Sequence, residues 1–436
     1  MPLSATIRHG FPTVGKLLAP VRWLVGSRRR VGIVALVCLA MAAAPVAWWE
    51  LQLVGLPDVG EPFDVAAFRA EAIPDEQNAY VLYRQAVLTY KPLTRGESAV
   101  SIRVGREARW EEVGEDVRGW VVGNRPALDL LRRGAERPDA FDPPDGTSRQ
   151  IARVETLGLL HRLAHVEASR LELAGDMAGA WDWYRADLRL IRHVGLRSTA
   201  DARQFAVGWQ VDLDRRVKRW AADPRTTLTQ MRDARDDAVA AGSMMPSDSA
   251  SVRANYLSAA LMPNGFDRLD ELYVSPMARS IRYFYLPLTR DQALALDEAV
   301  RTWRREPERC RRLARLLVAN RLAFLALPAD RRPAPDPGVV TTSLYAFSPA
   351  APAAARALTP DQLDIWLDTT PQRRMLIGMF DLSWLVAWET NTYRDLLVDL
   401  GTALYRRERG ADPPTPEALV GPYLPSLPPA ADTSSP

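Results

Sequence analysis

Residues 150–193 read QIARVETLGLLHRLAHVEASRLELAGDMAGAWDWYRADLRLIRH. Apolar side chains recur in the first half of this stretch at intervals of three and four, which places them on one face of a long helix. These side chains are Ile151, Val154, Leu157, Ala164, Ala168 and Leu171. Gly175 and Asp176 interrupt the pattern, and a second helix is expected over about 177–193. The sequence therefore predicts two antiparallel helices joined by a glycine turn.

Helical periodicity continues on both sides of this hairpin. Patterns with the same period cover about 64–90, 107–122, 126–135, 199–222, 226–241, 247–261, 290–304, 307–326, 359–367 and 372–409. No convincing alternation of apolar and polar residues predicts a strand. The expected fold class is therefore mainly α, with an irregular multi-helical body that is partly α-solenoid-like.

The N-terminal region contains a run without charge. Residues 31–49 carry no charged side chain, and Arg28, Arg29 and Arg30 precede them directly. A helix of this length crosses most of a hydrocarbon core about 30 Å thick. We therefore expect a single transmembrane helix over 31–49, in contact with membrane lipid. A cleaved signal peptide is the alternative, because Ala40, Ala42 and Ala44 offer small residues for cleavage.

The charge of the flanking segment predicts the orientation. Residues 1–30 hold six basic residues and no acid, while the whole chain has a net charge of +3, so the remainder has a net charge of −3. Short basic flanks stay on the cytoplasmic side of a membrane. We expect a protein of the inner membrane with a cytoplasmic N-terminus and its main domain on the periplasmic side. Both interpretations of residues 31–49, a transmembrane helix and a cleaved signal peptide, predict that the same domain is exported.

The domain plan follows from these patterns and from the prolines. It comprises a basic cytoplasmic segment (1–30), the transmembrane helix (31–49), a stalk (50–63), a helical domain (64–327), a Pro-rich linker, long loop or lid (328–355), C-terminal helices that pack on the body (356–412) and a Pro-rich tail (413–436). Leu419, Tyr423 and Leu427 are expected to dock the tail on the body.

Composition excludes several classes of function. The exported part is slightly acidic and shows no basic face with interleaved aromatic residues, so no nucleic-acid partner is expected. The two cysteines, Cys38 and Cys310, lie in segments that cannot plausibly meet, so the domain must be held together by burial. No Gly-rich phosphate loop, G-x-S-x-G elbow or cysteine metal knuckle is present, and no cofactor is expected.

Residues 168–188 resemble one tetratricopeptide hairpin. The matching positions are Ala168, Leu171, Gly175, Asp176, Ala180, Tyr184 and Leu188. The resemblance implies two helices whose close approach needs small side chains at Ala168 and Ala180. Arrays of this family repeat near 34 residues, but a shift of 34 places Trp209 where glycine should stand and Asp214 where alanine should stand. A single hairpin in an irregular helical domain is the favoured interpretation.

His161 and His165 are four residues apart on the first helix, a spacing that can place two imidazoles on one metal ion. No glutamate lies between them to act as a general base, and helical projection places both histidines in or beside the apolar stripe. Hydrogen-bonded core histidines are the favoured interpretation, with a metal site as the alternative. No catalytic residue can be nominated.

Trp181, Trp183 and Tyr184 follow the glycine turn and are candidates for a ligand or partner groove, because aromatic side chains supply area and stacking faces. Ordinary helical packing explains Tyr184 and at least one of the tryptophans without a ligand. Both interpretations remain open from the sequence.

The C-terminal run 410–428, GADPPTPEALVGPYLPSLP, resembles a segment near the end of pilin-like anchored bacterial proteins. Residues 429–433 depart from that pattern, and Pro12, Lys16 and Pro20 interrupt the long N-terminal helix that a pilin requires. The overall plan also resembles uncharacterised single-pass, membrane-anchored helical proteins of GC-rich bacteria. That resemblance implies an architecture and no activity.

Three functions are therefore considered. The leading hypothesis is a protein-interaction or scaffold module of the cell envelope with a protein partner, because helical hairpins are present and catalytic signatures are not. The second is an exported hydrolase with carboxylates or with His161 and His165. The third is an accessory factor of secretion or pilus-like machinery, which rests on the tail alone.

Overall fold

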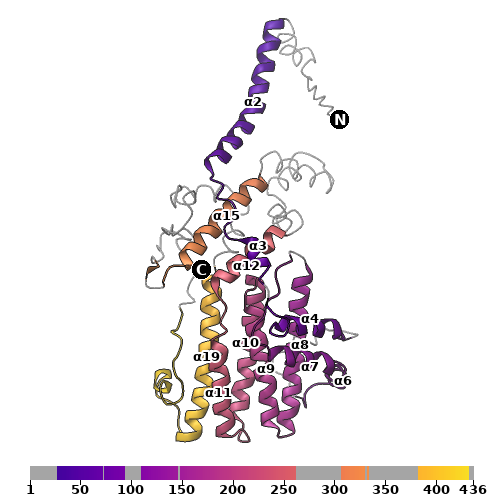
Figure 1. The fold of residues 1–436 in the computed structure, drawn as a ribbon, viewed down its shortest axis with the longest axis vertical. Helices are drawn as coiled ribbons and strands as arrows, with labels where there is room; N and C mark the ends of the chain where they lie inside the picture. Colours follow the sequence, from indigo (N-terminus) through magenta and orange to yellow (C-terminus); the bar gives the residue numbers. More distant parts are fainter. Residues whose placement is uncertain are drawn as a thin grey trace, which may run out of the picture. The chain divides into compact units, whose positions relative to one another are not determined.

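The computed structural model describes residues 27–71, 73–93, 110–145, 148–261, 306–328, 331–332 and 382–431. The chain divides into two compact units, one of residues 1–57 with 277–309 and one of residues 58–276 with 310–436. The described ranges contain twelve α-helices and no strand (Figure 1). The predicted mainly α fold class is therefore confirmed. The helices expected at 290–304 and 359–367, and nearly all of the Pro-rich segment 328–355, lie outside the described residues.

The first unit contains helix α2 (Arg28–Gly55). This helix includes the charge-free run 31–49, but it begins within the arginines and continues through Glu50. Across the ranges described above, no helix combines the length and the apolar character that a membrane span requires. A helix is thus present where one was predicted, whereas its transmembrane character gains no support.

Two layers of helices build the second unit. One layer contains α8 (Ser148–Leu173), α10 (Ala200–Ala222) and α19 (Ser383–Arg409), and the other contains α7 (Arg125–Ala135), α9 (Met177–Gly195) and α11 (Leu228–Gly242). Helix α9 contacts α7, α8, α10 and α11, and α10 contacts α19 (Figure 1). The core of the unit lies between these layers.

Side-chain contacts show how the helices of the first layer run. Trp209 of α10 lies against Gly158 of α8, and Arg216, seven residues later, donates to the carbonyl of His165 at 3.5 Å. Along α10 and α19 the residue numbers of paired side chains also increase in the same direction, from Arg203 with Glu389 to Lys218 with Asp399. Helices α8, α10 and α19 are therefore parallel.

The turn between α8 and α9 has the conformation that its sequence predicts. Gly175 has a φ of 83°, which only glycine adopts readily, and the side chain of Asp176 accepts a hydrogen bond from Gly179 N at 2.8 Å. Ala168 and Ala180 are fully buried. The predicted helical hairpin is present, with helices of 26 and 19 residues.

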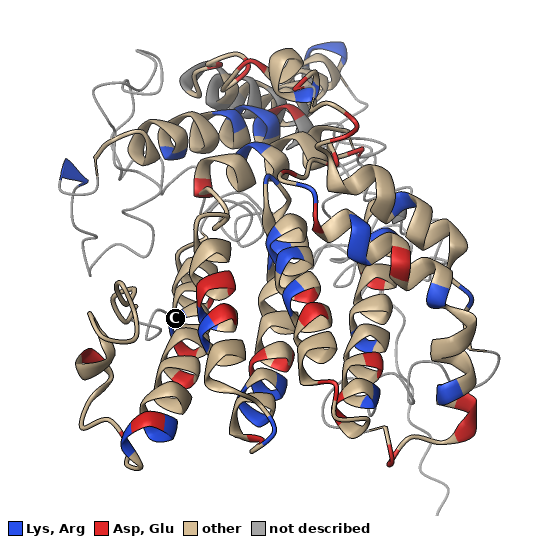
Figure 2. Ribbon diagram, turned by 60° about the horizontal axis from the view of Figure 1, so that its bottom comes forward, with Lys and Arg blue, Asp and Glu red and all other residues tan. Residues whose placement is uncertain are grey.

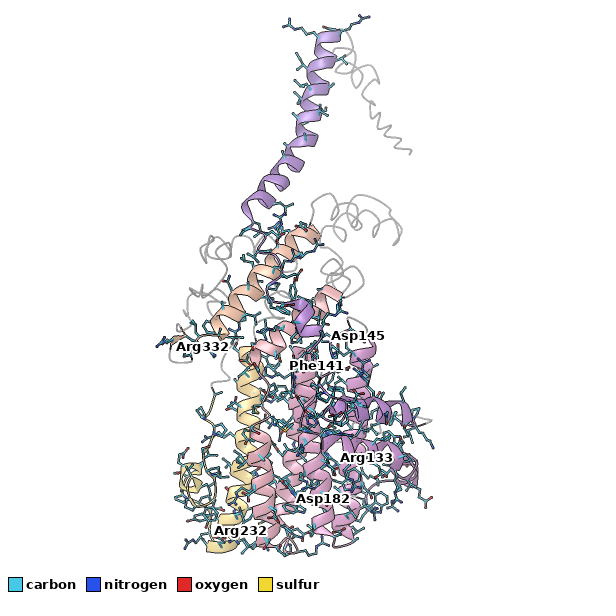
Figure 3. All side chains as sticks on the ribbon, viewed as in Figure 1. Arg133, Phe141, Asp145, Asp182, Arg232 and Arg332 are labelled. Atoms are coloured by element: carbon cyan, nitrogen blue, oxygen red, sulfur yellow. The ribbon has the colours of Figure 1, made fainter. Side chains whose placement is uncertain are left out.

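The remaining helices of the described ranges do not belong to these two layers. They are α3 (Val65–Arg69), α4 (Ala79–Thr89), α6 (Glu115–Gly123), α12 (Asp248–Leu261), α15 (Glu306–Leu325) and the 3-10 helix η4 (Pro416–Leu419). Phe141 belongs to a small aromatic cluster at one end of the bundle, and Asp182 and Arg232 lie at the opposite end (Figure 3). Arg315 of α15 pairs with Asp58 at 3.2 Å and with Glu61 at 2.6 Å.

Buried ionic contacts attach α19 to the body. Glu389 accepts two hydrogen bonds from Arg203, at 3.0 and 2.6 Å, and lies 3.8 Å from Arg192. Arg192 also lies over the ring of Tyr393, 5.0 Å from its centroid. These four side chains are buried, and Arg203 also donates a hydrogen bond to Asp248 at 2.9 Å, so Glu389 and Asp248 together balance the charges of the two arginines.

The C-terminal tail docks on α19 through the expected side chains. Leu419 and Tyr423 are buried, and Leu427 packs partly against the core. Gly401 of α19 allows this contact, because a Cβ atom there would lie only 3.1 Å from Leu419. Asn391 donates to the carbonyl of Ala431 and accepts from its amide, both at 2.8 Å.

Glu389→Ala should lower the free energy of unfolding by about 3 kcal/mol or more, because it leaves buried arginine charge without its main partner. Asp399→Ala on the same helix removes only an ion pair with the exposed Lys218, so its effect should stay below about 1 kcal/mol. Urea unfolding of both variants measures the difference. Equal losses would contradict the proposed attachment of α19.

Candidate functional site

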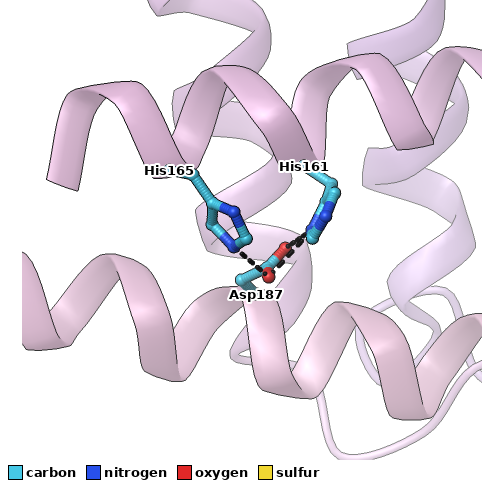
Figure 4. A group of neighbouring side chains, drawn as sticks. All are labelled: His161, His165 and Asp187. Carbon is cyan, nitrogen blue, oxygen red and sulfur yellow. Dashed lines mark hydrogen bonds and ion pairs between the residues drawn. The ribbon is translucent and has the colours of Figure 1, made fainter. Parts of the chain in front are cut away.

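Three ionisable side chains meet inside the second unit. His161 and His165 point from α8 toward Asp187 of α9, and all three are fully buried (Figure 4). His161 Nδ1 lies 2.8 and 2.9 Å from the two carboxylate oxygens, and His165 Nε2 lies 2.8 Å from one of them. The four-residue spacing on α8 thus brings the two histidines together. The sequence analysis did not predict Asp187 as their partner.

Burial and hydrogen bonding determine the charge states of this cluster. Burial lowers the pKa of His165 to about 3, His161 adds to the lowering and Asp187 opposes it. Burial also acts to raise the pKa of Asp187, but the two imidazoles and their hydrogen bonds outweigh it and lower that pKa to about 2. An ionised carboxylate that accepts N–H donors from both rings is the state that these shifts favour.

The cluster has the donor types of a zinc or iron(II) site, because two imidazoles and a carboxylate lie within 4.8 Å of one another. Ligands about 2.1 Å from one tetrahedral ion stand about 3.4 Å apart. The observed separations of 2.8–2.9 Å are those of hydrogen bonds instead, and His161 Nδ1 faces both oxygens. Metal-bound histidines usually donate their second ring N–H, whereas the second ring nitrogens here have no hydrogen-bond partner within the described ranges. The geometry is that of a hydrogen-bonded link between α8 and α9.

The three aromatic residues predicted to form a groove are placed differently from one another. Trp181 and Tyr184 are buried and have hydrogen-bond partners, Asp237 at 2.8 Å and Glu172 at 2.7 Å. Trp183 lies beneath Arg132, 5.3 Å from the guanidinium carbon, and lines a small cavity of about 320 Å³. The structure therefore brings the three into no common groove.

A larger groove opens on the outer face of the other layer. Its volume is about 720 Å³. Its walls and floor come from α8, α10 and α19, and we call it the α10 groove; among its residues are Ile151, Arg162, Phe205, Gly208, Trp209 and Trp388. All three parallel helices contribute to it.

One stripe of α10 forms the floor of this groove. Asp201, Phe205, Gly208, Asp212 and Arg215 follow one another at intervals of four and three, so they lie on one face of the helix. Most of the buried residues of α10 lie on its other faces, but Trp209 is buried and also lines the groove. Phe205 is 41% exposed. In the sequence it is a large apolar side chain outside the core stripe of α10, and this position could have indicated the groove.

Trp209 connects the groove with the buried cluster. Its ring stacks on His161 with centroids 5.4 Å apart and an interplanar angle of 18°, and the same side chain lines the groove. Gly158 makes room for it, because a Cβ atom at this position would lie 2.9 Å from the indole ring. The hydrogen-bonded cluster therefore supports the floor of the groove from below.

No family model, curated protein or solved structure matches this chain. Its function must therefore be argued from geometry and charge. Basic and acidic positions are interspersed along the helices of the bundle (Figure 2). The α10 groove shares this mixture, with Asp201 at one end and Arg162, Asp212 and Arg215 toward the other.

Asp187→Leu should lower the free energy of unfolding by about 3–5 kcal/mol, because two buried N–H donors lose their acceptor. The triple variant His161→Leu, His165→Leu and Asp187→Leu should recover most of this loss, since an apolar replacement of a buried polar group is often close to neutral. Urea unfolding tests both. A triple variant less stable than the single one would show that the cluster does more than join two helices.

The stability of the protein should fall in mild acid. Burial lowers the pKa of His193 to about 3, as it does for His165, whereas an unfolded histidine has a pKa near 6.5. Between these values the unfolded chain binds more protons, so the free energy of unfolding decreases as the pH falls, by up to about 1.4 kcal/mol per pH unit for each histidine.

His193→Gln should reduce the dependence of the free energy of unfolding on pH by the contribution of one histidine. Glutamine does not titrate, but it can still accept a hydrogen bond from the Tyr83 hydroxyl, which lies 2.8 Å from His193 Nδ1. Urea unfolding between about pH 6.5 and pH 5 separates this effect from that of the carboxyl groups. The same dependence of unfolding free energy on pH in both proteins would contradict the lowered pKa of His193.

Proposed function

We propose that the second unit is a protein-interaction module that binds a segment of another protein in the α10 groove. The observation that carries the proposal is an open groove of about 720 Å³ whose floor and walls include Phe205, Trp209 and Trp388. Tryptophan in particular is enriched among the few residues that dominate the binding free energy of protein interfaces.

Exposed apolar side chains around the groove support the proposal. Ile151 is 46% exposed and Phe205 41%, and both belong to the groove. Trp384, 40% exposed, stacks on Trp388 with ring centroids 6.4 Å apart. Burial of the exposed part of one such side chain, a little under half of it, stabilises a complex by roughly 0.6–1.4 kcal/mol, so a partner that covers this surface gains affinity from several residues.

The hydrolase alternative has less support. A general base must come within about 3 Å of the proton that it removes, or reach it through one water molecule. His161, His165 and Asp187 are fully buried, and Trp209 lies between His161 and the groove. A substrate in the groove would therefore not reach the imidazoles. The role beside secretion machinery has only the sequence of the tail in its favour.

We also propose that residues 31–49 anchor the module in the inner membrane, with the second unit on the periplasmic side. The support is the charge-free run, its basic flank and the exposed apolar side chains of α2, which include Ile33, Leu36, Leu39 and Met41. Alkaline carbonate extraction of membranes and protease treatment of spheroplasts test this proposal. Recovery of the protein in the soluble fraction would overturn it.

Photo-crosslinking tests the binding proposal. A photoreactive phenylalanine at position 208 should capture one defined segment of a partner in the cells that make the protein. The same residue at Gly119 of α6 is the matched control, since both glycines are helical and a Cβ atom at either meets nothing within 4 Å. The same adduct from position 119, or none from position 208, would overturn the proposal.

Gly208→Phe should block the groove without unfolding the protein. The added side chain enters open space, and replacing a helical glycine improves helix propensity by a few tenths of a kcal/mol. The thermal midpoint should therefore stay level with that of Gly119→Phe, while recovery of the crosslinked partner in a pull-down falls by about tenfold or more. Equal recovery with both variants would place the partner elsewhere on the surface.

A further inference from the structure

We infer that the face of α11 and α19 beneath the C-terminal tail is a second binding site, and that the tail of another copy of this chain is its ligand. We call this face the tail site. The chain's own residues 413–431 occupy it in the structure (Figure 1). The inference is independent of the proposed function, since Asn391, Arg394 and Gly401, which hold the tail, do not line the α10 groove.

The tail folds back along the helix that precedes it. Gly410 ends α19 with a φ of 70°, a conformation that glycine adopts more readily than other residues. The hydroxyl of Tyr423 donates to Glu408 at 3.0 Å, whereas Ala431 pairs with Asn391. As the tail advances, its partners on α19 therefore lie nearer the start of that helix.

Residues 416–424 satisfy much of their own backbone hydrogen bonding. They begin with η4, and the carbonyl of Leu419 accepts from the amides of Tyr423 at 3.0 Å and Leu424 at 2.9 Å. The amide of Gly421 in turn donates to the carbonyl of Leu424 at 2.7 Å. A segment bonded in this way needs little from the site for its backbone, so it can bind as a small preformed unit.

An apolar part of the tail site receives this unit. Leu419, Tyr423 and Leu424 are buried, whereas most other residues of the tail are exposed. The three heavy atoms nearest to a Cβ atom built at Gly401 all belong to Leu419 and Leu424, at 3.1–3.4 Å. The ring of Tyr423 lies 5.5 Å from that of Tyr405. The missing side chain at Gly401 thus makes room for the two leucines.

Side chains of the bundle also bind the backbone of the tail. Asn391 donates to the carbonyl of Ala431 and accepts from its amide, both at 2.8 Å. Arg394 donates to the carbonyl of Pro428 at 2.5 Å, and Arg235 of α11 donates to a further tail carbonyl at 3.3 Å. A division between main-chain hydrogen bonds and pockets for selected side chains is typical of sites that bind a separate peptide.

A second copy of the chain supplies a ligand that fits this site, because its tail has the same sequence. Besides its apolar anchors, the tail offers Glu417 to Arg394 at 3.0 Å and the hydroxyl of Tyr423 to Glu408 at 3.0 Å. An exchanged tail makes these contacts again, so exchange costs no interaction within the site.

The connection between α19 and the tail decides which copy's tail is bound. Arg406 and Asp412 form an ion pair in this connection, but both side chains are exposed, so the pair contributes little. A short connection gives the resident tail an effective concentration in roughly the millimolar range. At lower protein concentrations the resident tail therefore predominates, and the tail of a second copy binds where the resident one is disabled.

Two full-length variants separate the ligand from its site. The tail-blocked chain carries Leu419→Ser, Tyr423→Ser and Leu424→Ser, which disable the resident tail and leave the tail site intact. The site-blocked chain carries Gly401→Leu, which fills the space of the two leucines and leaves the tail intact. Gly119→Leu in α6 is the matched control, because a Cβ atom there meets nothing within 4 Å. A fluorescent peptide of residues 413–431 is the probe, and fluorescence anisotropy measures its binding.

The peptide should bind the tail-blocked chain at least about tenfold more tightly than it binds the wild-type chain or Gly119→Leu, because no resident tail competes. Adding Asn391→Ala to the tail-blocked chain should weaken the peptide by about three- to tenfold, since two hydrogen bonds to its backbone are lost. A mixture of the tail-blocked and site-blocked chains should form a complex in analytical ultracentrifugation, and neither chain should form one alone.

Equal binding of the peptide to the tail-blocked and wild-type chains would overturn the binding site. Peptide binding without a complex in the mixture would overturn the second copy as the ligand. Circular dichroism checks that the variants are folded. Should a variant unfold, Tyr423→Ser alone weakens the resident tail, and Asn391→Ala with Arg394→Ala releases it from α19 without filling the site.

Discussion

The buried carboxylate of Asp187 is the constraint on which the arrangement of the second unit depends. An ionised group without access to water must find its hydrogen-bond donors within the protein, and here both come from one face of α8. Sliding α9 by one residue along α8 would rotate the carboxylate away from these donors. Because α9 contacts four of the long helices, the register that Asp187 imposes on α8 and α9 extends to both layers.

The position of α10 depends on a contact with the same buried cluster. Trp209 stacks on His161, and Gly158 leaves the space that the indole ring fills. With Trp209 held in this way, the next outward residues of α10 form the floor of the groove. The binding surface is therefore set by packing beneath it, which keeps its residues in fixed positions before a partner arrives.

Local patterns in the sequence predicted the helices well and the groove poorly. The expected helices at 126–135, 177–193 and 199–222 agree with α7, α9 and α10 to within about two residues, because helical periodicity is a property of neighbours along the chain. The groove instead needs Trp388 beside Phe205, and nothing local relates residues so far apart. The 34-residue shift failed for a physical reason: helices of 26 and 19 residues put Trp209 opposite Gly158, a displacement of 51.

The distance in sequence between Arg203 and Glu389 has a consequence for the newly made chain. The two residues are 186 positions apart, and both are buried in the finished protein. At synthesis rates of about 5–20 residues per second, roughly 10–40 seconds pass between the emergence of Arg203 and that of its partner. During this interval α10 and α11 lack the α19 contacts of the finished protein, so a nascent chain exposes apolar surface, and Arg192 and Arg203 lack Glu389. The apolar surface that α19 covers is therefore buried only after the C-terminal part of the chain has been made.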